Sequence, residues 1–310
     1  MNSYTIPENI TSLRDVILWT EKIFNQNDIF FGHGTDNALD EAAYLISYCA
    51  DMPVNFTDDD LDYQLTSTQR DKVSEALALR IEQKIPVAYI TNKAYFFGLE
   101  FNVNESVLIP RSPIAELIAE QFSPWFDYKT WQEKNNQPLE ILDMCTGSGC
   151  IAIACATAFD SAHVDAVDIS EAALDVANSN IKKHNLENHV HAIQSDMFKN
   201  LPQKKYDIIV SNPPYVTQDE IDNLPDEYHK EPSQGLYAAN EGLEFAISLL
   251  KNANQFLSEE GIIVIEVGNS AEALQNYYPN IPFTWLEFEM GGEGVLLLDA
   301  AQIKQFYLQF

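Results

Sequence analysis

The chain has 310 residues, of which 46% are hydrophobic and 21% charged, a composition typical of a globular protein with a sizeable core. It contains no apolar run of about 18 residues or more and starts without a basic segment followed by an apolar one. We therefore expect neither a membrane span nor a secretory signal. The net charge of −29 repels a phosphate backbone, which argues against a DNA partner and favours a cationic one. Solubility or a salty or cold habitat explains the same charge equally well.

Cysteine usage points to a cytoplasmic protein without a metal site. Four cysteines are few for a disulfide scaffold, so we expect reduced thiols. Three of them, Cys145, Cys150 and Cys155, recur every five residues, a spacing that gives them no common face on a helix. We expect no metal here.

The first 92 residues are expected to form a helical module. Apolar residues recur with helical periodicity in three segments: 11–24, 38–50 and 66–83. Thr11 or Ser12 is suited to cap the first helix, and Ser67 or Thr68 the third. The pattern changes at residues 93–109, where aromatic and β-branched residues surround Gly98, which predicts a β-hairpin linker.

Residues 110–310 are expected to form an α/β domain. Pro113 is suited to a helix start. Apolar strand candidates then occur at 139–144, 163–169, 190–195, 206–212 and 261–268. Helical patterns at 149–158, 171–184 and 241–257 separate most of them, which predicts a mostly parallel sheet covered on both faces. Residues 282–290 and 294–300 predict a final antiparallel pair.

A glycine loop follows the first of these strands. Asp143 ends the strand, Gly147 and Gly149 follow, and a helix begins, an arrangement that lets a ligand approach the backbone. Asp168, at the end of the next strand, is suited to bind both ribose hydroxyls of an adenosine, and Asp196 follows the third strand. This loop alone is compatible with a nicotinamide dinucleotide or with S-adenosylmethionine.

The fourth strand runs into Asn212-Pro213-Pro214-Tyr215, here called the NPPY corner. Residues that precede proline are restricted to extended conformations, so the backbone is stiff. The side-chain oxygen of Asn212 and the carbonyl of Pro213 then form two fixed acceptors, suited to a planar NH2 group. Tyr215 is suited to stack on that group and to favour a developing cation. An amide or a base amine attacking a methyl group on sulfonium fits this arrangement.

The segments "DMCTGSG", "AVDIS", "SDMF" and "IVSNPPYV" together resemble class I S-adenosylmethionine-dependent methyltransferases of the protein-glutamine type. The resemblance implies a Rossmann-like domain with an antiparallel last strand, a hairpin linker and an N-terminal helical domain that recognises the substrate. Residues 31–46, 85–101 and 109–118 resemble the branch that methylates a glutamine of the large-subunit ribosomal protein uL3. Cys145 departs from the family pattern, which has glycine there.

The resemblance also implies roles for residues. The implied cofactor site comprises Asp143, Cys145, Thr146, Gly147, Ser148, Gly149, Asp168, Ile169, Asp196, Met197 and Asn212. The implied substrate site comprises Asn212, Pro213, Pro214 and Tyr215, of which Asn212, Pro213 and Tyr215 are the catalytic candidates. Glu231 resembles part of the pocket mouth. Glu266 lies near the pocket or is a plain carboxylate at a sheet end, and His33 is expected to serve loop structure or substrate docking.

Four alternatives remain at this point. A release-factor glutamine methyltransferase is the sister branch, which usually has Asp-Thr-Glu after Pro-Arg-Pro, whereas this chain has a different sequence after Arg111. A DNA adenine methyltransferase needs a basic groove, which the charge opposes. A nicotinamide oxidoreductase leaves the NPPY corner unexplained, and a non-catalytic assembly factor for ribosomal proteins leaves the catalytic elements without a purpose. The sequence indicates neither the target glutamine nor the oligomeric state.

Overall fold

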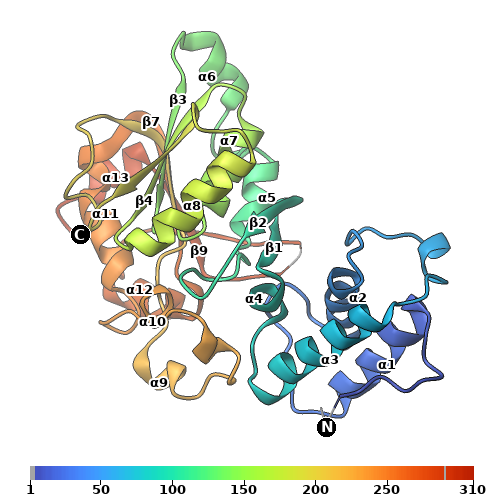
Figure 1. The fold of residues 1–310 in the computed structure, drawn as a ribbon. Helices are drawn as coiled ribbons and strands as arrows, with labels where there is room; N and C mark the ends of the chain where they lie inside the picture. The colour runs from blue at the N-terminus through green and yellow to red at the C-terminus, as the bar shows by residue number, and fades with distance from the viewer. Residues whose placement is uncertain (1–3, 290) are drawn as a thin grey trace. The chain divides into compact units, whose positions relative to one another are not determined.

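The computed structural model describes residues 4–289 and 291–310, which form two compact units (Figure 1). The first, called the helical unit, comprises residues up to Ala94 together with Val103–Glu105 and Leu224–Lys230. The second, called the sheet unit, comprises Tyr95–Asn102, Ser106–Asn223 and Glu231–Phe310. The segment Leu224–Lys230 follows the NPPY corner closely in the chain yet packs in the helical unit, which no sequence pattern indicated.

The helical unit is built from amphipathic helices around an apolar core. Its elements are α1 (Leu13–Asn25), α2 (Ala38–Cys49), η1 (Asp58–Asp60), α3 (Ser67–Glu82), α4 (Val87–Thr91) and, from the later segment, η2 (Tyr228–Lys230). Ser12 caps α1, one of the two expected residues, by accepting from the backbone N–H of Asp15. The cap of α3 is Thr66 rather than Ser67 or Thr68, because Thr66 and Gln69 form a reciprocal capping box and Ser67 is already helical.

A buried ion network holds the later segment in the helical unit. Arg80 is 1% exposed. Its Nε donates to Glu41 at 2.6 Å, and its guanidinium donates to Glu227 at 2.8 Å. Burial raises the pKa of Glu41, whereas at Glu227 the bonds from Arg80 and from the backbone N–H of Phe30 outweigh burial and lower the pKa. Removing Arg80 would leave two buried carboxylates uncompensated.

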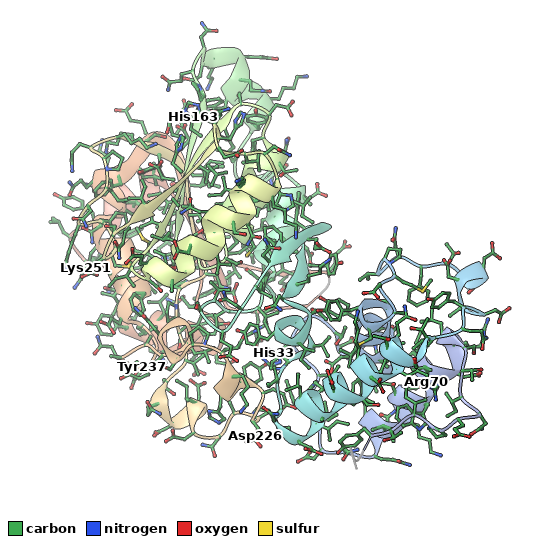
Figure 2. All side chains as sticks on the ribbon, in the orientation of Figure 1. His33, Arg70, His163, Asp226, Tyr237 and Lys251 are labelled. Carbon is green, nitrogen blue, oxygen red and sulfur yellow. The ribbon has the colours of Figure 1, made fainter. Side chains whose placement is uncertain are left out.

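The same segment carries an aromatic contact with a residue singled out in the sequence. The ring of His33 lies 4.5 Å from that of Tyr228, between centroids, and His33 is buried in the helical unit. Figure 2 labels His33 and Asp226, a neighbour of Tyr228 in the chain. Packing against its own unit accounts for the position of His33.

The expected hairpin is present but shorter than predicted. Its strands are β1 (Lys93–Phe96) and β2 (Leu99–Asn102), and Phe97 and Gly98 both have positive φ in the turn between them. Such a turn matches the twist of a two-residue hairpin. The backbone N–H and C=O groups of Asn102 instead bond the Asn180 side chain, at 2.7 and 3.0 Å. Strand β2 therefore ends at Asn102, whereas the sequence predicted a hairpin up to residue 109.

A seven-stranded sheet forms the core of the sheet unit, in the order β5-β4-β3-β6-β7-β9-β8. Its strands are β3 (Leu139–Met144), β4 (Ala162–Asp168), β5 (Val190–Gln194), β6 (Tyr206–Ser211), β7 (Leu257–Glu266), β8 (Thr284–Leu286) and β9 (Val295–Asp299). The first five are parallel to one another, and β9 is antiparallel to both β7 and β8. The predicted α/β class and antiparallel last strand are confirmed. The expected strand over 282–290 is shorter, and Met290 lies outside the described residues.

Helices cover both faces of this sheet (Figure 1). One face carries α5 (Ile114–Ala119), α7 (Cys150–Ala158) and α8 (Glu171–Lys183), and the other carries α11 (Glu244–Phe256), α12 (Ala271–Tyr277) and α13 (Ala300–Phe306). Short helices α6 (Tyr128–Lys134), α9 (Gln218–Ile221), η3 (Gly268–Ser270) and α10 (Ser233–Leu236) lie in the connections. Leu250 of α11 is fully buried in the core, whereas Lys251 is exposed on its outer side (Figure 2). Within the described residues, no helix has the length and apolarity of a membrane span.

Candidate active site

The candidate site lies where four neighbouring parallel strands end. In the order β4-β3-β6-β7, Met144 pairs with Val167 and Ser211, and Ser211 pairs with Ile265. The residues that follow these strands therefore meet at one edge of the sheet, the usual ligand position in such folds. The glycine loop, Asp168, the NPPY corner and Glu266 are all brought to this edge.

Asp143 holds the two ends of the glycine loop together by hydrogen bonds. It is fully buried, and its Oδ2 accepts from the Thr146 hydroxyl and from the backbone N–H of Ala152 at 3.0 Å. Its Oδ1 is buried and has no hydrogen-bond partner among the residues that the structure describes. Burial raises the pKa of Asp143 to about 7, against the opposing hydrogen bonds from Thr146 and Ala152. An orphaned carboxylate oxygen in this position is suited to a cationic or N–H ligand.

The two glycines of the loop serve different purposes. Gly147 has a φ of 54°, and a Cβ there would meet nothing within 4 Å, so it borders open space. Gly149 has a φ of 80°, and a Cβ there would lie 3.3 Å from that of Ala177 on α8, so it allows close helix packing. Cys145, the residue that departs from the resembled sequence pattern, has a φ of 63°. Left-handed backbone at a residue with a Cβ is mildly strained, so glycine would adopt this conformation more easily than Cys145 does.

Asp168 fastens the glycine loop to the next strand. Its Oδ2 accepts from the backbone N–H of Gly147 and its Oδ1 from that of Ser170, both at 2.9 Å. Burial raises the pKa of Asp168 against these two bonds. The adjacent Ile169 is 49% exposed and offers an apolar surface beside the carboxylate.

The residues after β5 are less clearly directed toward the site. The carboxylate of Asp196 is half exposed and pairs with Lys199, three residues further on. Met197 has a φ of 50° and packs partly buried against the core. The Asp196 carboxylate is thus engaged in a local surface ion pair.

The NPPY corner begins one residue after β6 ends. The Ser211 hydroxyl donates to the carbonyl of Met144 at 2.6 Å and so joins the corner to the glycine loop. Pro213 and Pro214 are buried, whereas Asn212 is partly exposed. Within the described part of the chain, no hydrogen bond is present to the Asn212 side-chain amide, which leaves its oxygen available to a ligand.

The contacts of Tyr215 include three that hold it in place. Its hydroxyl donates to Glu266 Oε1 at 3.0 Å, and its carbonyl lies 3.1 Å from the Ser270 hydroxyl. Its ring covers Gly268, where a Cβ would lie 2.5 Å from Tyr215 Cε2. Sequence reasoning did not foresee these contacts, because they join residues about fifty positions apart.

Two further contacts organise the segments around the corner. Glu231 is 5% exposed and accepts two bonds from the Arg111 guanidinium, at 2.7 and 2.6 Å. It also accepts from the backbone N–H of Ile109 at 3.0 Å. Glu231 therefore anchors the 109–111 segment and is largely withdrawn from solvent. Ser112 Oγ donates to Glu266 Oε2 at 2.5 Å.

The parallel sheet with its reversed last strand, the glycine loop after β3, the acid after β4 and the NPPY corner after β6 together define a class I methyltransferase. A family model described as "Methyltransferase small domain" matches residues 130–228. Among the residues described, no group of three or more His, Cys, Asp and Glu side chains has the arrangement of a metal site.

Two curated proteins resemble the chain over nearly its whole length. The ribosomal protein uL3 glutamine methyltransferase of Francisella tularensis is 42% identical over 301 residues, covering 97% of this chain and 94% of that protein. The protein of the same name from Neisseria meningitidis is 40% identical over 296 residues, covering 96% and 95%. The chain belongs to the family of ribosomal protein uL3 glutamine methyltransferases.

Proposed function

We propose that the protein transfers a methyl group from S-adenosyl-L-methionine to the side-chain amide nitrogen of a glutamine in ribosomal protein uL3. The observation that carries the proposal is the NPPY corner, which leaves the Asn212 side chain partly exposed and, among the described residues, without a hydrogen-bond partner. The corner is joined to the glycine loop by the bond from Ser211 to Met144. The names of the two relatives specify methylation of a glutamine in ribosomal protein uL3.

The residues present fit the methyl donor. The orphaned Oδ1 of Asp143 suits a cationic group, Gly147 borders open space, and each oxygen of Asp168 retains a lone pair for a ribose hydroxyl. Ile169 offers exposed apolar surface to an adenine. When bound, S-adenosyl-L-methionine supplies an electrophilic methyl group on a sulfonium centre. Cys145, Thr146, Ser148, Gly149, Asp196 and Met197 complete the proposed donor site.

The NPPY corner would prepare the amide nitrogen for attack. The Asn212 side-chain oxygen and the Pro213 carbonyl accept hydrogen bonds from the two N–H groups of the glutamine amide. This arrangement turns the nitrogen lone pair toward the electrophile. Both acceptor dipoles also stabilise the positive charge that develops on nitrogen. No strong base is needed before transfer, since the proton leaves the nitrogen afterwards. Pro214 keeps the corner stiff, and Tyr215 borders it.

The substrate side of the proposal rests on charge and on the relatives. A net charge of −29 favours association with a basic protein, and ribosomal proteins are of that kind. We assign substrate recognition to the N-terminal region, residues 1–92, with residues 93–109 as linker and 110–310 as the catalytic domain, in the cytoplasm. DNA, membranes and metals have no role in the proposed reaction.

Labelled methyl transfer tests the proposal. The purified protein and labelled S-adenosyl-L-methionine are added to a lysate from cells that lack the enzyme, and labelled proteins are identified by mass spectrometry. We expect a single labelled glutamine in uL3. Asn212→Ala should lower the rate at least about a hundredfold, as loss of one preorganised catalytic hydrogen-bond partner does. Asn252→Ala, in α11, where the Asn252 amide donates to the carbonyl of Ser248 at 2.8 Å, serves as the matched control and should retain the rate.

The alternatives appear as different labelled products. Label in a peptide release factor would move the protein to the sister activity, and label in DNA would overturn a protein substrate altogether. Full activity of Asn212→Ala would remove the amide-binding role from the NPPY corner.

A further inference from the structure

Glu266 is a buried carboxylate at the carboxyl end of β7 to which the proposed reaction assigns no task. Only 5% of its surface is exposed, and both hydrogen bonds to its carboxylate come from neutral hydroxyls, those of Ser112 and Tyr215. Burial raises the pKa of Glu266, while the two hydroxyls and the nearby Arg111 oppose that rise. A buried carboxylate whose hydrogen bonds come from neutral hydroxyls is costly to a protein, so its presence beside the NPPY corner points to function.

The hydroxyl of Tyr215 is one end of a side chain whose other parts are also fixed. The ring is seated on Gly268, where no side chain could be accommodated, and the backbone carbonyl lies 3.1 Å from the hydroxyl of Ser270. The bond to Glu266 holds the hydroxyl end of the ring, so without it Tyr215 would lose a contact that sets the direction of its side chain. Glu266 therefore selects one orientation of Tyr215.

The orientation of Tyr215 is transmitted to the amide acceptors by the two prolines. Proline fixes φ, and a residue before proline is confined to extended conformations, so few torsions between Asn212 and Tyr215 are free to absorb a shift. At the other end, Ser211 is held to the carbonyl of Met144 at 2.6 Å. The corner is thus clamped at both ends, by Ser211 on one side and by Tyr215 on the other.

The carboxylate is itself held from a third segment. The Ser112 hydroxyl donates to Glu266 Oε2 at 2.5 Å and accepts from the backbone N–H of Ile114, at the start of α5, at 3.2 Å. Glu266 therefore joins the start of α5, the end of β7 and the NPPY corner through two hydroxyls. All of these residues belong to the sheet unit.

We propose that Glu266 is a positioning residue for methyl transfer: it holds the hydroxyl of Tyr215 and so fixes the two acceptors of the NPPY corner that grip the amide. This inference rests on the proposed function, because it specifies how the amide-binding corner is kept in its working geometry. Glu266 touches neither donor nor substrate in this role. Its effect on the reaction passes entirely through Tyr215.

A double-mutant cycle on kcat tests the link. Glu266→Leu removes both acceptors at similar volume, and Tyr215→Phe removes only the hydroxyl. Each should lower kcat roughly tenfold or more, the scale of losing a hydrogen bond to a charged group. Because both changes break the same link, the double variant should be no slower than the slower single variant. Glu266→Gln keeps an acceptor and should restore most of the rate.

The remaining measurements separate positioning from general stability. Donor affinity by calorimetry should be nearly unchanged in Tyr215→Phe, and kcat is measured well below the thermal midpoint, because the lost bond to a buried carboxylate also lowers stability. Tyr95→Phe is the matched control, since it removes a tyrosine–carboxylate bond of 2.9 Å to Glu100 on the exposed hairpin, and it should keep full kcat. Full kcat in Tyr215→Phe, or independent losses that multiply in the double variant, would overturn the inference while leaving the proposed function intact. Failure of the proposed function is read separately, from full activity in Asn212→Ala.

Discussion

The stability of the Asp143→Asn variant relative to the parent protein should increase as the pH rises. The folded protein holds the pKa of this carboxyl near 7, against 3.8 for the ordinary group, because the side chain is fully buried. The folded state therefore binds the proton more tightly than the unfolded state does. Stability is lost as the pH rises between 3.8 and about 7, and asparagine, which does not titrate, escapes this loss.

The magnitude follows from the pKa shift. The pKa rises from 3.8 to about 7, and each pKa unit corresponds to about 1.4 kcal/mol. At pH values above 7, the charged Asp143 therefore lowers the free energy of unfolding by about 4 kcal/mol. Near pH 5 the same relation gives a loss of about 1.7 kcal/mol. The loss of stability caused by Asp143 is therefore about 2 to 3 kcal/mol larger above pH 7 than near pH 5. The new amide N–H group at the orphaned Oδ1 position is unsatisfied and costs about 1 to 3 kcal/mol at either pH. The net gain near pH 8 is therefore smaller than 4 kcal/mol, but its pH dependence survives.

Denaturant unfolding of both proteins near pH 5 and near pH 8 measures this difference. All other titrating groups are shared and cancel. Asp175→Asn, at an exposed position on α8, is the matched control and should give almost the same stability difference at both pH values. A gain that is equal at both pH values in Asp143→Asn would refute the reasoning. The variant should also bind the cationic donor more weakly, since it has lost the negative charge.

Two further predictions concern the donor loop. Asp168→Ala should weaken S-adenosyl-L-methionine binding by about 1 kcal/mol or more, because charge-assisted hydrogen bonds to ribose are lost, and unchanged calorimetric affinity would contradict the ribose role. Cys145→Val should destabilise the protein by about 1 to 2 kcal/mol, because a β-branched residue at a φ of 63° is strained. Cys145→Gly should stay within about 1 kcal/mol of the parent, because relief of strain offsets the lost side chain and the greater chain entropy of glycine. Equal stability of the two variants by denaturant unfolding would argue against backbone strain at this position.

Local sequence patterns were sufficient for the elements that present the site. The apolar run that ends at Ser211 predicted β6 to within one residue, because a strand buried on both faces has a continuous apolar sequence. The glycine loop was recognisable because the residues that close it, Asp143 and Ala152, lie within ten positions of one another. Capping was less predictable: Thr66, Ser67 and Thr68 have similar propensities, and only the side chain of Gln69 selects the first.

Contacts between distant segments were not predictable in the same way. Glu266 was an ambiguous carboxylate at a sheet end until β7 and β6 were paired and Tyr215 was found against it. Arg80 was part of an ordinary amphipathic helix, and the segment that carries its partner Glu227 comes 147 positions later. Hydrogen-bond partners at such separations depend on strand order and helix packing, which no local pattern records.

The sequence by itself determined the kind of chemistry, because the groups that define it are consecutive in the chain: a glycine loop after a strand, and an amide followed by two prolines. Proline geometry and glycine freedom act locally, so their consequences were visible before any fold was known. Only the tertiary structure decided how the NPPY corner is held. The hydrogen bonds from Tyr215 and Ser112 to Glu266 form only when the NPPY corner, the start of α5 and the end of β7 come together. Because Glu266 is then buried, its carboxylate is a fixed acceptor rather than a solvated charge.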